Sequence, residues 1–116
     1  MEQEFSLTSE TRANCLIITT CGYVNNKGGE AIAKEFSQHF EKGTKNIVIN
    51  LAQSKVVNSI GMSFLIEIID QLNDADGKLV FTNLDPAVEK MLNIMGLFQF
   101  AGKEKTVDDA LKSFAG

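Results

Sequence analysis

The chain of 116 residues is poor in the residue types from which most catalytic and metal sites are built. It contains one histidine, two cysteines, one proline and no tryptophan. A single histidine excludes multi-histidine metal sites and a histidine relay, and two cysteines exclude a disulfide scaffold. Nine glycines with one proline exclude collagen and low-complexity disorder. The composition therefore predicts a protein that is not an enzyme and has no cofactor and no metal site.

An excess of positive charge and a long apolar run are also missing. The chain contains eleven Lys and Arg residues and fifteen Asp and Glu residues. The resulting net charge of −4 argues against direct nucleic-acid binding. No segment approaches the roughly 18 continuous apolar residues of a membrane span. The polar, acidic start MEQEFSLTSE is unlike a secretory signal. These features predict a cytoplasmic protein without membrane contact.

The two cysteines support the same compartment. Cys15 and Cys21 bracket one apolar run. If that run is a strand, about 3.3 Å per residue places their sulfurs about 20 Å apart, which is too far for a disulfide. Two buried thiols in a reducing cytoplasm are the expectation.

The length and the periodicity of apolar residues predict the fold class. A chain of 116 residues with 44% hydrophobic residues is sufficient for one domain, over residues 1–116. Short apolar runs predict strands at 4–8, 14–20, 46–51 and 78–82, with a short edge strand at 97–100. Amphipathic stripes predict helices from Glu30, after Ser59, from Pro86 with Asp85 as its N-cap, and after a capping box at 106–109. The apolar stripe of the third helix is expected to contain Val88, Met91, Leu92 and Met95. The prediction is an α/β fold with a four- or five-stranded mixed sheet and about four helices.

Two features of the sequence resemble functional sites but match no established motif. His39, near the end of the first predicted helix, is interpreted as a solvated helix residue. The segment Asn25–Gly29 contains two glycines and precedes a helix, but it matches neither of the established glycine-rich phosphate motifs. A small nucleotide-binding protein that uses this loop remains an alternative.

The segment Asn58-Ser59-Ile60-Gly61 opens the second predicted helix. Ser59 is expected to be the N-cap, and a phosphoryl group on its hydroxyl would be tolerated at the positive end of the helix dipole. Met62 belongs to the predicted buried side, whereas Ile60 falls nearly opposite and Phe64 lies on the border. Ile60 is either covered by a neighbouring loop or part of an exposed docking patch.

The ordered set of motifs resembles the STAS domain family of bacterial anti-sigma factor antagonists. Residues 48–62 resemble its signature of a strand followed by Asp-Leu-Ser and then Asp-Ser-Ser/Thr-Gly-Leu, with Ser59 at the phosphorylated position and Gly61 at the glycine. Residues 22–24, 84–98 and 107–111 resemble further family segments. The sequence departs from the pattern at Asn50 and Asn58, where the family has aspartate, and at Ile60, where it has Ser or Thr.

The resemblance implies a STAS-like fold and the function of an anti-sigma factor antagonist. Such a protein binds a serine-kinase anti-sigma factor, is phosphorylated by it at the position of Ser59, and is restored by a serine phosphatase; ATP belongs to the kinase. The implied partner-binding residues are Asn25, Asn26, Asn58, Ser59, Ile60, Gly61, Met62 and Phe64. A monomer or weak dimer is expected. The alternative within the family is a protein-binding module outside sigma control, in a signalling complex or as a transporter-associated subunit.

Overall fold

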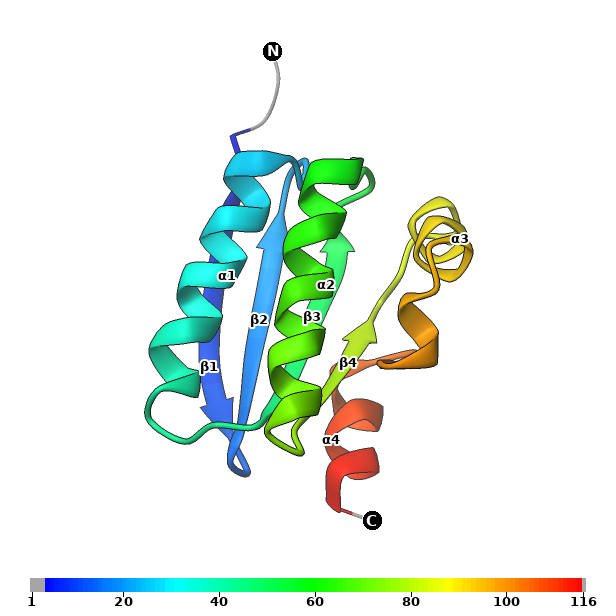
Figure 1. The fold of residues 1–116 in the computed structure, drawn as a ribbon. Coiled ribbons are helices and arrows are strands. Elements are labelled where there is room, and N and C mark those ends of the chain that lie inside the picture. The colour runs from blue at the N-terminus through cyan, green and yellow to red at the C-terminus, as the bar shows by residue number, and fades with distance from the viewer. Residues whose placement is uncertain (1–3, 116) are drawn as a thin grey trace.

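A five-stranded mixed sheet forms the centre of the computed structural model, which describes residues 4–115 (Figure 1). The strands are β1 (Ser6–Arg12), β2 (Cys15–Cys21), β3 (Asn46–Gln53), β4 (Lys78–Thr82) and β5 (Gly102–Glu104), in this spatial order. β1 is antiparallel to β2, and every later pair is parallel. The predicted mixed sheet is confirmed, while both ends of the predicted domain, residues 1–3 and 116, lie outside the described residues.

The first hairpin shows how local sequence fixes strand pairing. Ala13 and Asn14 both have positive φ, 51° and 65°, which is the requirement of a two-residue hairpin turn that follows the twist of the strands. Arg12 therefore pairs with Cys15, and β1 runs over residues 6–12 rather than the predicted 4–8. Cys15 and Cys21 lie at opposite ends of β2 and do not form a disulfide with each other, as expected. Only Cys15 is buried, whereas Cys21 is half-buried, so the expectation of two buried thiols is wrong for Cys21.

The helices lie in two layers around the sheet. α1 (Asn26–Phe40) and α2 (Ser59–Asp74) pack side by side on one face (Figure 1). α4 (Val107–Ala115) covers part of the opposite face, where it contacts β3, β4 and β5. α3 (Pro86–Ile94) and the 3₁₀ helix η1 (Leu97–Gln99) lie beside β4.

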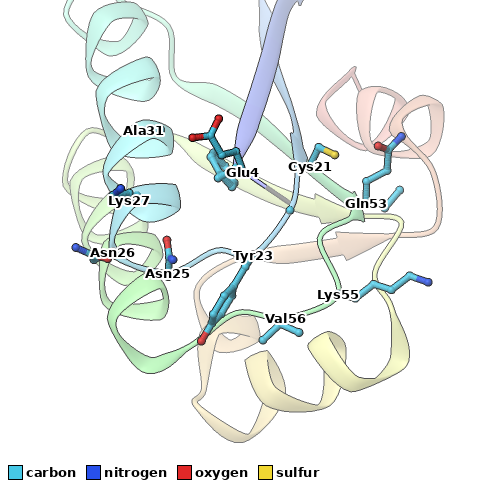
Figure 2. A pocket seen from close by; sticks show the side chains of 13 residues that line it. Glu4, Cys21, Tyr23, Asn25, Asn26, Lys27, Ala31, Gln53, Lys55 and Val56 are labelled. Carbon is cyan, nitrogen blue, oxygen red and sulfur yellow. The ribbon is translucent and has the colours of Figure 1, made fainter. Parts of the chain in front are cut away.

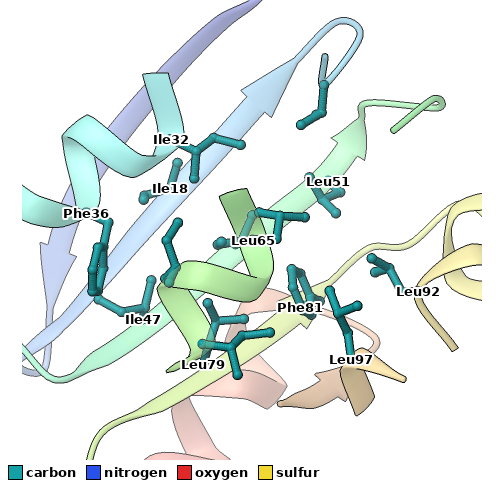
Figure 3. Close-up of a cluster of buried hydrophobic side chains, with 14 of the residues drawn as sticks. Ile18, Ile32, Phe36, Ile47, Leu51, Leu65, Leu79, Phe81, Leu92 and Leu97 are labelled. Atoms are coloured by element: carbon teal, nitrogen blue, oxygen red, sulfur yellow. The ribbon is translucent and has the colours of Figure 1, made fainter. Parts of the chain in front are cut away.

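The hydrophobic core is divided between the two faces. The larger cluster fills the space between the sheet and α1 and α2 (Figure 3), and it includes Ile18, Phe36, Ile49, Leu65 and Phe81. The smaller cluster lies under α4 and consists of Ile17, Val48, Val80 and Ala110. Because both faces of β2, β3 and β4 are covered, these strands appear in the sequence as nearly continuous apolar runs.

Two further predictions differ from the structure. α1 begins at Asn26, four residues before Glu30, because Gly28 and Gly29 belong to the helix. The predicted edge strand at 97–100 is η1, and the edge strand is β5. Gly96 has φ 81° immediately before η1, a left-handed conformation that turns the chain away from an extended path.

The caps of the last two helices are confirmed. Asp85 accepts a hydrogen bond from the backbone N–H of Ala87, and Thr106 accepts one from that of Asp109. Each interaction satisfies an N–H group that has no partner within its own helix.

His39 is better anchored than a solvated helix residue. Its Nε2 lies 3.2 Å from Oε2 of Glu35, one helical turn away. The hydroxyl of Ser9 on β1 donates to the same carboxylate oxygen at 2.5 Å. Because the serine contacts the carboxylate rather than the imidazole, this cluster links β1 to α1 and does not activate a nucleophile.

Candidate functional site

The N-termini of α1 and α2 are built from the same five-residue pattern. Val24–Gly28 and Val57–Gly61 both read Val-Asn-x-x-Gly. In each copy the valine is buried and the asparagine is the N-cap. The side chain of Asn25 accepts from the N–H of Gly28 at 3.1 Å, and that of Asn58 accepts from the N–H of Gly61 at 2.8 Å. Two helices are thus capped in the same way at the same end of the molecule.

Backbone hydrogen bonds tie these two starts together. Val24 and Val57 form a parallel β-bridge beyond the ends of β2 and β3. The N–H of Val24 donates to the carbonyl of Val56 at 3.0 Å, and the N–H of Asn58 donates to the carbonyl of Val24 at 3.1 Å. The loops that lead into the two helices therefore continue the pairing of the sheet and hold both N-termini in register.

Glycines permit the close approach of the helices. A Cβ on Gly61 would lie 2.2 Å from the carbonyl oxygen of Val24, a distance that no side chain tolerates. A Cβ on Gly29 would lie 2.5 Å from the ring of Phe64. Gly28 similarly faces Phe5 and the carbonyl of Tyr23. The glycines of Asn25–Gly29 therefore serve packing, while the alternative of a nucleotide-binding loop stays a prediction.

Ser59 is the first residue of α2 and not its N-cap, which corrects the sequence-based expectation. Asn58 performs the capping, and the side chain of Ser59 is exposed. Asparagine caps a helix about as well as aspartate. The departure from the family pattern at Asn58 thus keeps the helix start intact while it removes one negative charge beside Ser59.

Asn50 has a comparable local role. Its side-chain oxygen accepts a hydrogen bond from the backbone N–H of Ala52 at 2.9 Å, near the end of β3. Below the loop that follows, the hydroxyls of Thr20 and Ser54 form a buried hydrogen bond of 2.6 Å. Polar contacts therefore hold the end of β3 and the first residue of the loop that follows it.

Three apolar side chains are exposed at this end of the fold. Ile60 is 52% exposed, Val56 54% and Tyr23 38%, and Figure 2 shows Tyr23 beside Val56. We call Tyr23, Val56, Ser59 and Ile60 the switch surface. Ile60 was expected to be either covered by a neighbouring loop or exposed, and the structure shows it exposed.

The other residues expected to bind a partner differ in accessibility. Asn26 is exposed, while Asn25 and Asn58 are half-buried in their caps. Met62 is 1% exposed and belongs to the core, so its assignment as a partner-contact residue is wrong. Gly61 is also buried. Phe64 is half-buried against Gly29, which makes it a packing residue between α1 and α2.

An open groove of about 930 Å³ adjoins the switch surface (Figure 2). Tyr23 and Val56 line it together with Lys27, Lys55 and the carboxylate of Glu4. The groove offers apolar contacts and charged groups, which suits binding of another molecule. Across residues 4–115, no group of three or more His, Cys, Asp or Glu side chains could hold a metal ion.

The sequence-based reasoning missed Tyr23 and Val56, and it missed the pairing of the two helix starts. The signal was present in the repeated Val-Asn-x-x-Gly pattern. A pattern that recurs after two neighbouring parallel strands places both copies at the same edge of the sheet.

Comparison with known proteins gives a consistent result. A family model described as "STAS domain" matches residues 6–110. The "Putative anti-sigma factor antagonist BtrV" of Bordetella bronchiseptica is 26% identical over 110 residues, which cover 92% of this chain and 95% of that protein.

Solved structures share the fold. An anti-sigma factor antagonist from Mycobacterium paratuberculosis superposes with a TM-score of 0.85 at 18% identity, covering 97% of this chain and 96% of the other. The Bacillus protein SpoIIAA in its phosphorylated form superposes with a TM-score of 0.75 at 18% identity, covering 94% of this chain and 99% of the other.

No helix in the described part of the chain is long and apolar enough to cross a membrane.

Proposed function

Because the chain belongs to the STAS domain family, we propose that it is a cytoplasmic anti-sigma factor antagonist whose switch surface binds a serine-kinase anti-sigma factor. Phosphorylation of Ser59 by that kinase ends the binding, and a serine phosphatase restores it. The name of the Bordetella relative and the phosphorylated form of SpoIIAA support this assignment.

The observation that carries the proposal is the position of Ser59. Its side chain is exposed at the first residue of α2, while Asn58 satisfies the N–H of Gly61. A kinase can therefore modify the hydroxyl without removing the cap of the helix. The phosphoryl group would also lie near the positive end of the helix dipole, which stabilises negative charge. The modified protein is expected to remain folded.

The apolar neighbours explain why a phosphate would prevent binding. It adds about −1.5 to −2 charges, directly beside Ile60, which is 52% exposed. A partner that buries Ile60 must remove water from the phosphate, and desolvating an unpaired charge costs several kcal/mol. In the free protein the phosphoryl group stays in water and leaves the stability of the fold unchanged. The added charge therefore weakens the complex and not the fold.

Phosphate mapping tests the site of modification. The protein is incubated with ATP and candidate serine-kinase anti-sigma factors of the source organism, and the phosphopeptides are identified by mass spectrometry. Ser63 provides a matched control, because it is exposed on the same helix and its hydroxyl donates to the carbonyl of Ile60. We expect Ser59→Ala to abolish incorporation and Ser63→Ala to retain it. Equal incorporation into wild type and Ser59→Ala would exclude Ser59 as the switch.

Partner binding tests the surface. We expect Ile60→Asp to weaken binding of the anti-sigma factor more than tenfold, as loss of a central apolar contact commonly does, with little change in melting temperature. Binding is measured by isothermal titration calorimetry with the kinase that modifies the protein. Binding that is insensitive both to Ile60→Asp and to phosphorylation would instead support a module outside sigma control.

A further inference from the structure

A second apolar surface lies between α2 and the segment formed by α3 and η1. Ile66 of α2, Met95 after α3 and Phe100 after η1 line a hollow of about 120 Å³. Ile66 is seven residues beyond Ser59, which corresponds to about 10 Å along the helix. The hollow therefore lies on a different part of α2 from the switch surface.

α3 extends this surface. Val88 and Leu92 are buried and attach the helix to the core, but Met91 and Met95 are exposed, so half of the predicted apolar stripe faces solvent. Ile94, outside that stripe, is exposed as well. We call Ile66, Met91, Ile94, Met95 and Phe100 the α2–α3 surface. Their side chains are 36–71% exposed. Together they present on the order of 500 Å² of apolar area, at the upper end of the largest patch on a typical monomer, which is often functional.

The charges around the hollow have one sign on the α2 side. Asp70 lines the hollow, and the exposed residues Glu67 and Asp74 lie one turn before and after it. α2 contains no Lys or Arg. On the α3 side the charges are mixed, because the exposed Lys90 precedes Met91 and Glu89 pairs with Lys103 at 2.7 Å. A ligand that covers the apolar residues therefore meets an acidic rim along α2.

These observations select one kind of occupant. A second copy that packed its α2 against this α2 across a two-fold axis would bring the carboxylates of Glu67 and Asp70 from both copies close together. Like charges brought together in this way disfavour the complex. A partner with positive charge beside its apolar side chains avoids this repulsion and pairs with the rim.

We infer that the α2–α3 surface binds a basic amphipathic helix of a partner protein. One large apolar side chain of that helix fills the hollow beside Ile66 and Phe100, and a Lys or Arg one turn away pairs with Asp70. Met91 and Met95 are flexible and polarizable, which allows the surface to adapt to the shape of the bound helix. The inference does not depend on Ser59, because the two surfaces have no residue in common.

Two synthetic peptides test the inference on the full-length protein. Both carry the same leucines at helical spacing, and their polar faces carry lysine in one peptide and glutamate in the other. Binding is measured by fluorescence anisotropy, and the contact surface is mapped by chemical shifts of ¹⁵N-labelled protein. We expect the lysine peptide to bind at least tenfold more tightly, with shifts at residues 66–70 and 91–100.

Variants separate the apolar and the charged contributions. We expect Phe100→Ser to weaken the lysine peptide about tenfold and Asp70→Asn to weaken it about threefold, in line with an exposed charge pair. Glu30→Gln on α1 is the matched control for Asp70→Asn, since both carboxylates are exposed on helices, and it is expected to have no effect. Equal affinity for both peptides, shifts elsewhere or absence of binding would overturn the inference. Self-association through Phe100 in sedimentation experiments would also overturn it, because the occupant would then be a second copy.

Discussion

Replacement of Gly61 by alanine tests the close contact between α2 and the loop that precedes α1. The added Cβ would lie 2.2 Å from the carbonyl oxygen of Val24, and it must retreat to at least 3.0 Å. The obstacle is backbone, so a rotamer change cannot relieve it. Either α2 or the loop has to move by about 1 Å, in a region that packs as tightly as the rest of a protein interior.

The magnitude follows from the groups that move. Displaced packing costs about 1–3 kcal/mol, and loss of the 3.1 Å bond from Asn58 N–H to Val24 adds about 1 kcal/mol. The higher helix propensity of alanine offsets about 1 kcal/mol. We expect a net loss of about 1–3 kcal/mol from a total stability on the order of 10 kcal/mol.

Urea unfolding monitored by circular dichroism measures this loss. Gly29→Ala is the matched control, because its added Cβ would meet the half-buried side chain of Phe64 and not backbone. We expect that variant to lose about 1 kcal/mol as the ring shifts toward solvent. A loss below 1 kcal/mol for Gly61→Ala, or equal losses for both variants, would refute the reasoning.

Three further predictions concern the same regions of the fold. Asn58→Ala is expected to destabilise the protein by about 1 kcal/mol in urea unfolding while Asn58→Asp leaves it nearly unchanged, because only alanine lacks the capping oxygen. Phe64→Asp is expected to lower the free energy of unfolding by about 2–3 kcal/mol, since its ring packs on Gly29; Ile60→Asp, at an exposed position, is the control and changes it by less than about 0.5 kcal/mol. Burial raises the pKa of the Cys15 thiol, so the unfolded chain releases this proton first, and stability is expected to fall as pH rises past the ordinary value of 9.0. Urea titrations over a pH series should show this slope in wild type and a smaller one in Cys15→Ala.

The sequence predicts most of the sheet because burial on both faces leaves a strong local signal. The runs around Ile18, Ile49 and Phe81 each contain at least three consecutive apolar residues, and they became the three central strands. Asp85 and Thr106 were identified as caps because capping depends on a few neighbouring residues. Local chemistry is sufficient for these elements.

The errors arise where a contact from a distant segment decides the structure. Gly28 and Gly29 were interpreted as a loop, but they lie inside α1, where Phe5 and Phe64 leave no room for a Cβ. Ser59 and Asn58 are both good capping residues, and only the position of the loop decides that Asn58 caps α2. The periodicity of α3 identified an apolar stripe but not that Met91 faces solvent, since a short helix beside the sheet is covered on one side only.

The bridge between Val24 and Val57 has a consequence for how the switch surface forms during folding. The two segments that form this surface are separated in the chain by α1 and β3. The surface is therefore complete only after the chain has folded back over this long separation. Contacts of this kind form only after considerable chain entropy has been lost. A chain released before α2 is made has Tyr23 but not Ser59 or Ile60. A partner that contacts both segments therefore binds only the fully folded protein. The amide protons of Val24 and Asn58 are expected to exchange with solvent mainly through global unfolding.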